Sequence, residues 1–150
     1  VLATDFSQAV IQKNIAFYKH LPDVIFKVLD MTEPINLLDN TYDVVYARLS
    51  LHYFTDEVTR TIIREVLRVL KPDGLFCFIC KSTTDPLYGK GEALEKNMFN
   101  DKGKTRHFFS EEYVKSLLVG NFSIEKMESG NEKFYGSDSA YVKVIAKATK

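Results

Sequence analysis

Two acidic residues follow apolar segments whose composition predicts β-strands. Asp5 comes directly after Val1–Thr4, and Asp30 comes directly after Val24–Leu29. In doubly wound parallel sheets, ligands bind beyond the carboxyl ends of the strands. A carboxylate at such an end can accept hydrogen bonds from both hydroxyls of a ribose. The two acids therefore predict a nucleoside site.

A structural explanation exists for each acid alone, because Asp5 could cap the following helix and Asp30 could form a turn. The two occur together, each after a strand, at the spacing that a βαβ repeat requires, and this favours the nucleoside interpretation. In that interpretation Asp5 binds the ribose and Phe6 covers the adenine face. Asp30 accepts the adenine amino proton, and Met31 packs on the ring.

A third polar strand end is found in the segment Asp43–Phe54. Its strand, Asp43–Ser50, is apolar in the middle, as in a strand that is covered on both faces, and it ends in polar residues. We expect Arg48 and Leu49 to contact the same bound cofactor. His52 has a side chain that titrates near neutrality and could remove a proton from a substrate; the alternative is a structural histidine that lines the pocket.

Further substrate-binding candidates are Tyr53, which follows His52, and four residues between the next strand and the final helix. These four are Lys81, Tyr88, His107 and Phe108. The segment 82–107 has no clear period, and a loop of that length is usually functional or mobile. We expect it to form a lid over the substrate, with one short helix at Glu92–Met98. Simple solvation of its charges is the alternative, and Arg48 and Tyr53 could equally face solvent.

The remaining segments predict one α/β domain over residues 1–150, without an internal boundary. Helices are expected from Phe6 or Ser7 to Pro22, from Thr55 or Asp56 to Pro72, and at Glu111–Leu118 after the Ser110 cap, with one further turn after Pro34. Leu75–Cys80 should return to the sheet parallel to Asp43–Ser50. Phe122–Met127 and Ala140–Ala148 alternate apolar and polar residues, which indicates an antiparallel hairpin. The expected fold is a doubly wound, Rossmann-like, mostly parallel sheet with a C-terminal antiparallel hairpin.

Two cysteines form the motif Cys77-x-x-Cys80. Positions three apart on a strand point to opposite faces and lie roughly 10 Å apart, whereas a disulfide needs Cα atoms within about 7 Å. No second cluster of cysteine or histidine supplies further metal ligands. We therefore expect two buried thiols and no metal site.

The acid-tipped segments Ala3-Thr-Asp-Phe-Ser7 and Val28-Leu-Asp-Met31, with the run Asp43–Phe54 and the turn Leu70-Lys-Pro-Asp-Gly74, resemble the later part of a class I S-adenosylmethionine-dependent methyltransferase of the small-molecule type. The resemblance implies S-adenosylmethionine as cofactor, and it assigns Asp5, Phe6, Asp30 and Met31 the roles given above. It also implies catalysis mainly by proximity and in-line alignment. That mechanism favours the structural role for His52.

The resemblance begins after the family's first strand and glycine-rich loop, which normally contact the methionine end of the cofactor. Gly89-Lys-Gly91 does not replace that loop, because it follows no strand. We expect an upstream segment to supply it, the alternative being a partner chain, and we expect the N-terminally truncated chain to be inactive by itself.

Composition restricts the partners. The chain carries 20 basic and 20 acidic residues, so no net field attracts nucleic acid or an anionic membrane. No run of about 18 apolar residues and no signal-peptide pattern is found, so we expect a cytoplasmic protein that acts on a small molecule, with homo-oligomerisation left open. Two alternatives remain: a noncatalytic interaction domain with the same fold, and an NAD-dependent oxidoreductase, which the terminal hairpin disfavours.

Overall fold

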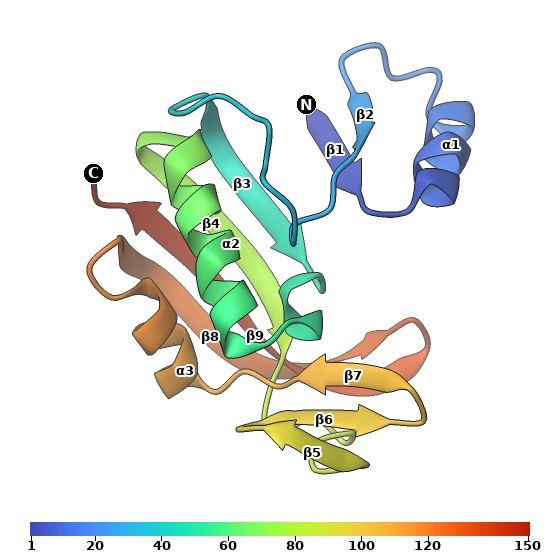
Figure 1. Ribbon diagram of the computed structural model, residues 1–150, viewed down its shortest axis with the longest axis vertical. Helices are drawn as coiled ribbons and strands as arrows, with labels where there is room; N and C mark the ends of the chain where they lie inside the picture. The colour runs from blue at the N-terminus through green and yellow to red at the C-terminus, as the bar shows by residue number, and fades with distance from the viewer. The chain divides into compact units, whose positions relative to one another are not determined.

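The computed structural model describes residues 1–150 and divides into two compact units, 1–37 and 38–150 (Figure 1). The first unit is a βαβ segment. It contains β1 (Leu2–Asp5), α1 (Gln8–Phe17) and β2 (Ile25–Val28). The two strands pair in parallel, with Asp5 opposite Val28, so their carboxyl ends lie at one edge of this small sheet. The strand–helix–strand order that the sequence predicts is confirmed here.

The second unit is built on a four-stranded mixed sheet of order β3-β4-β9-β8. Its strands are β3 (Tyr42–Arg48), β4 (Leu70–Lys81), β8 (Phe122–Phe134) and β9 (Ser137–Ala148). β3 and β4 are parallel and are connected through α2 (Asp56–Val69), whereas β9 is antiparallel to both β4 and β8. The Rossmann-like α/β architecture and the antiparallel C-terminal hairpin are therefore both confirmed.

One face of the β3-β4-β9-β8 sheet carries the core. α2 and α3 (Glu111–Leu118) lie on that face (Figure 1). The buried apolar residues come from both layers: Phe76, Phe78 and Cys80 of β4, Val142, Val144 and Ala146 of β9, Ile62, Ile63 and Val66 of α2, and Val114, Leu117 and Leu118 of α3. Burial alternates along β4, as expected for a strand that packs a single face.

β3 differs from its expectation as a strand covered on both faces. Val44 and Tyr46 are more than half exposed. β4 is the only strand that pairs with β3. The apolar run therefore predicted the strand correctly, but the prediction that both faces of β3 are covered is wrong.

Residues 92–107 fold as a three-stranded antiparallel meander, so the short helix expected at Glu92–Met98 is wrong. The strands are β5 (Glu92–Glu95), β6 (Met98–Asp101) and β7 (Lys104–His107). Both connections use positive φ: Asn97 has φ 61° in the first, and Lys102 and Gly103 have φ 51° and 77° in the second. Two positive φ values in a two-residue connection are the pattern of a type I′ hairpin turn, which matches strand twist. The helical turn expected after Pro34 is also absent, since residues 34–38 have no regular structure.

The connection from β3 to α2 contains η1 (Leu51–Tyr53), a short 3₁₀ helix. α2 begins after Thr55, whose side chain accepts a hydrogen bond from the Val58 amide, and α3 begins after Ser110 in the same way, so both predicted caps are confirmed. None of the helices has the length and apolar composition that crossing a membrane demands.

Candidate functional site

The first unit presents two carboxylates at the ends of neighbouring strands. Asp5 ends β1, and Asp30 lies two residues beyond the end of β2. Asp5 Oδ1 accepts the Ser7 amide at 2.8 Å, and Ser7 is the residue that caps α1. Asp5 therefore orients the cap residue and is not itself the cap.

Asp30 also uses only one carboxylate oxygen within the protein. Its Oδ1 accepts the Thr32 amide at 2.9 Å and the Thr32 hydroxyl at 2.7 Å. The Thr32 hydroxyl and then the Thr32 amide lower the pKa of Asp30, so the side chain is ionised at neutral pH. The Oδ2 atoms of Asp5 and Asp30 make no hydrogen bond, which leaves each acid able to accept a ligand hydroxyl or amino group.

Apolar surface accompanies these acids. Phe6, which follows Asp5, is 75% exposed, and Met31, which follows Asp30, is half-buried. An exposed phenyl ring beside a free carboxylate oxygen suits a nucleoside. The ring offers a stacking surface for the base, and the oxygen accepts hydrogen bonds from hydroxyl groups. The local geometry of the first unit thus fits the expected cofactor edge.

Arg48 ends β3 in the second unit, and Leu49 follows it. The Leu49 amide donates to the Ile79 carbonyl at 2.8 Å, and the buried Leu49 has φ 53°, so the chain leaves the sheet sharply at this residue. The Arg48 guanidinium lies 5.6 Å from the ring centre of Phe134 and 6.0 Å from that of Tyr135, at the tip of the β8–β9 hairpin. Cation–π contacts thus hold Arg48 against this hairpin tip, a contact that the sequence did not indicate.

His52 lies in η1 and is 2% exposed. Its Nδ1 has no hydrogen-bond partner, and its ring packs against that of Tyr53 with centroids 4.5 Å apart. Burial, followed by the positive charges of Lys81 and Arg106, lowers the pKa of His52 to about 3. The imidazole is therefore neutral at physiological pH.

Lys81 ends β4 and forms a buried network. Its ammonium donates to Asp85 Oδ2 and to the Ser139 hydroxyl, both at 2.8 Å. Asp85 also accepts the amides of Leu87 at 2.9 Å and Ala140 at 3.0 Å. This network joins the start of segment 82–107 to the β8–β9 hairpin. The Lys81 ammonium is paired with the Asp85 carboxylate inside the protein.

The other three substrate candidates contribute to the packing of the meander. The Tyr88 hydroxyl donates to Asn97 at 2.9 Å, and the Tyr88 ring packs edge-on against Phe108, which is buried. His107 is buried, its Nδ1 lies 3.1 Å from the Phe54 carbonyl oxygen, and burial lowers its pKa. The structure therefore brings Tyr88 and Phe108 together, and it couples His107 to the connection that follows η1.

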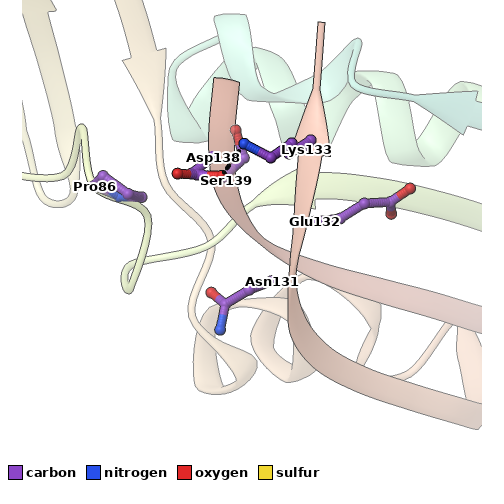
Figure 2. Close-up of a pocket in the computed structure, with 6 residues that line it drawn as sticks. All are labelled: Pro86, Asn131, Glu132, Lys133, Asp138 and Ser139. Carbon is purple, nitrogen blue, oxygen red and sulfur yellow. Dashed lines mark ion pairs between the residues drawn. The ribbon is translucent and has the colours of Figure 1, made fainter. Parts of the chain in front are cut away.

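Two surface hollows lie in the second unit. One, of about 330 Å³, lies between Pro86 and the β8–β9 hairpin (Figure 2). There Lys133 and Asp138 form a cross-strand ion pair at 2.9 Å, which neutralises the cation. The other, of about 510 Å³, is lined by Tyr53 together with Gly103, Lys104, Thr105 and Arg106 of the β6–β7 turn and β7.

The cysteines lie on β4 without a disulfide. Cys80 is fully buried, as expected, whereas Cys77 is only half-buried because its side of β4 is partly open. Burial raises the pKa of both thiols, so neither is a nucleophile at neutral pH.

Comparison with known proteins supports the same family. Residues 1–74 match the family described as a methyltransferase domain. Phosphoethanolamine N-methyltransferase 1 of Caenorhabditis elegans is 27% identical over 117 residues, which cover 78% of this chain and 24% of that protein. The chain thus spans about a quarter of the length of this curated relative.

Solved structures share the fold across the whole chain. The structure of an S-adenosylmethionine-dependent methyltransferase from Methanosarcina mazei gives a TM-score of 0.83 at 20% identity and covers 99% of this chain and 82% of that one. A second structure is that of 1,6-didemethyltoxoflavin-N1-methyltransferase from Burkholderia thailandensis with bound S-adenosylhomocysteine. It gives a TM-score of 0.74 at 18% identity, and the match covers 100% of this chain and 61% of that one. Residues 1–74 are thus similar to a methyltransferase domain, and the chain shares the fold of solved S-adenosylmethionine-dependent methyltransferases.

Proposed function

We propose that the protein transfers a methyl group from S-adenosylmethionine to a small molecule. The observation that carries this proposal is the methyltransferase-domain match over residues 1–74, which includes Asp5, Asp30 and His52. The free Oδ2 atoms at both strand ends are consistent with it. A fold alone does not establish an activity, so the proposal depends on these residues.

The residues of the first unit would hold the nucleoside part of the cofactor. Asp5 would accept the ribose hydroxyls, Asp30 the adenine amino group, and Phe6 and Met31 would cover the base. When bound, the sulfonium supplies an electrophilic methyl group. The second unit would hold the acceptor and exclude water from it.

Two roles are open to His52: proton acceptor for the attacking atom, or support for the acceptor site. Its imidazole is neutral, so its nitrogen lone pair is available, and its Nδ1 has no competing partner inside the protein. A pKa of about 3 makes it a weak base. A positioning role, in which His52 supports the Tyr53 ring, is therefore favoured over proton transfer.

The name of the curated relative gives the first acceptor to test. Phosphoethanolamine presents an amine for methylation and a phosphate for recognition. At 27% identity over part of a longer protein, this is a starting point for a screen that should also include other small amines and hydroxyl compounds.

Calorimetric titration with S-adenosylhomocysteine tests the cofactor site. Asp5→Asn and Asp30→Asn remove one charge each but keep an oxygen for the Ser7 or Thr32 amide. Because a hydrogen bond to a charged group contributes about 1.5–3 kcal/mol, each variant should bind about ten- to hundred-fold more weakly. Asp23→Asn, an exposed acid in the same unit, is the matched control and should bind as the unmodified protein does.

NAD serves as the competing ligand in the same experiment. Binding of NAD in preference to S-adenosylhomocysteine would replace the proposal with an oxidoreductase. If the full-length protein, with any upstream segment, is folded yet binds neither ligand, it is instead an interaction domain.

A further inference from the structure

The hollow beside Tyr53 carries positive charge without a matching acid. Its lining includes Lys104 and Arg106 from β7, and no acidic side chain contributes to it. Neither Lys104 nor Arg106 forms an ion pair. Two cations with no acidic partner in one concave site favour an anionic ligand.

Lys104 and Arg106 differ in this respect from several other cations of the second unit. Lys71, Lys81 and Lys133 each have a carboxylate oxygen within 2.9 Å. The chain has equal numbers of acidic and basic residues, so a pair of cations without acids is not the result of a general excess of positive charge.

The wall of the hollow is backed by a second polar feature. Tyr53 packs on His52, and His52 Nδ1 is buried without a hydrogen-bond partner. A buried unpaired nitrogen carries a desolvation cost that a polar group reaching it would relieve. Tyr53 itself is 54% exposed, and its hydroxyl is available to a ligand.

η1 and β7 pack against each other, and this contact places the cations beside the segment that follows β3. Arg106 is close enough to His52 for its charge to act on the imidazole. The hollow is therefore next to the strand end at which an α/β sheet of this type places its ligand.

We propose that this hollow binds an anionic group of the methyl acceptor, either a phosphate or a carboxylate. Arg106 would form a two-pronged contact with two oxygens, Lys104 would add a point charge, and the Tyr53 hydroxyl would donate a third hydrogen bond. The inference rests on the proposed function, because it assigns a part of the acceptor to this site. It also explains how the site would distinguish a phosphorylated or carboxylated amine from the neutral compound.

Inorganic phosphate is the probe, and its binding is followed by ³¹P nuclear magnetic resonance with acetate as competitor. Arg106→Gln should weaken phosphate binding about tenfold or more, and the double variant with Lys104→Gln should abolish it. Lys102→Gln is the matched control, because Lys102 lies in the same β6–β7 turn but does not line the hollow. This control should change phosphate binding less than twofold.

Titration with S-adenosylhomocysteine on the same samples separates this inference from the proposed function. Unchanged cofactor binding with lost phosphate binding in the Arg106→Gln variant supports both. Phosphate binding that is absent, or equal in all variants, overturns the anion site even if the cofactor binds. Loss of phosphate binding in the Arg106→Gln variant of a full-length protein that never binds the cofactor supports the anion site and refutes methyl transfer. Stronger competition by acetate than by phosphate would assign the site to carboxylates.

Discussion

Replacing Asp85 with alanine is expected to destabilise the second unit strongly. The Asp85 side chain has no exposed area, and it accepts hydrogen bonds from the Lys81 ammonium and from the amides of Leu87 and Ala140. Removal of this side chain leaves the Lys81 ammonium, on a side chain that is only 12% exposed, without its counter-charge. It also leaves two amides without their acceptor.

The magnitude follows from these contacts. Removing one partner of a buried ion pair costs about 3–5 kcal/mol. Because Lys81 keeps its hydrogen bond to Ser139, we expect about 3 kcal/mol, near the lower end. Asp85→Asn keeps an oxygen for the amides and should lose less than the alanine variant does.

Urea unfolding followed by tyrosine fluorescence measures this loss. Tyr18 is the only one of the 8 tyrosines that lies outside the second unit, and the chain has no tryptophan, so the signal reports mainly on the unit that contains Asp85. With a urea dependence of about 1–3 kcal/mol per molar, a loss of 3 kcal/mol lowers the midpoint by about 1–3 M.

An exposed ion pair of similar length provides the control. Lys133 and Asp138 lie 2.9 Å apart, with side chains 71% and 79% exposed, and such pairs contribute less than about 1 kcal/mol. Asp138→Ala should therefore leave the midpoint nearly unchanged. Equal shifts for Asp85→Ala and Asp138→Ala would refute the argument that burial gives the Lys81–Asp85 network its importance.

Two further predictions concern acid stability and the meander. His52 has a pKa of about 3 in the folded state, whereas an unfolded histidine titrates near 6.5. Unfolding below pH 6.5 therefore takes up a proton. The free energy of unfolding should consequently fall by up to about 1.4 kcal/mol per pH unit as the pH drops. His52→Gln should flatten this dependence between pH 6.5 and 5 in urea unfolding, and an unchanged slope would contradict the assignment. Gly91→Ala should destabilise the β5–β6 pair, because φ is 86° and a Cβ would clash with the Asn100 carbonyl oxygen. Gly103→Ala, with φ 77° but open space, should lose only about 1 kcal/mol; limited proteolysis of the meander compares the two, and equal protection of both variants would argue against the clash.

Local signals explain which elements the sequence revealed. The helix caps at Thr55 and Ser110, and the acids at Asp5 and Asp30, depend on residues within a few positions of one another. Short-range chemistry of this kind can be recognised without knowledge of the fold. These features were accordingly predicted at the correct places.

The meander could not be recognised in the same way. Its strands have four residues each, and β5 is exposed along its whole length, so no apolar alternation marks it. Asp101-Lys-Gly-Lys104 was the available signal, because Gly103 in a two-residue turn indicates a hairpin. Lys104, which depends on this turn for its position, was missed as a candidate for the same reason.

Long-range contacts account for the other differences. The sequence nominated Lys81 for substrate binding, yet its ammonium contacts Asp85 and Ser139, and Ser139 lies on a strand that follows much later in the chain. Likewise Arg48 contacts aromatic residues of the β8–β9 hairpin tip. No local pattern contains information about such partners.

The position of β4 between β3 and β9 has a consequence for synthesis on the ribosome. β4 can pair with β3 as soon as α2 has formed, but its other edge waits for β9, which is made only after the meander, α3 and β8. During that interval a largely apolar strand shows an open row of amides and carbonyls, the arrangement that recruits other chains into aggregates. Slow translation of the segment between β4 and β9 should therefore reduce the yield of native protein and increase its dependence on chaperones.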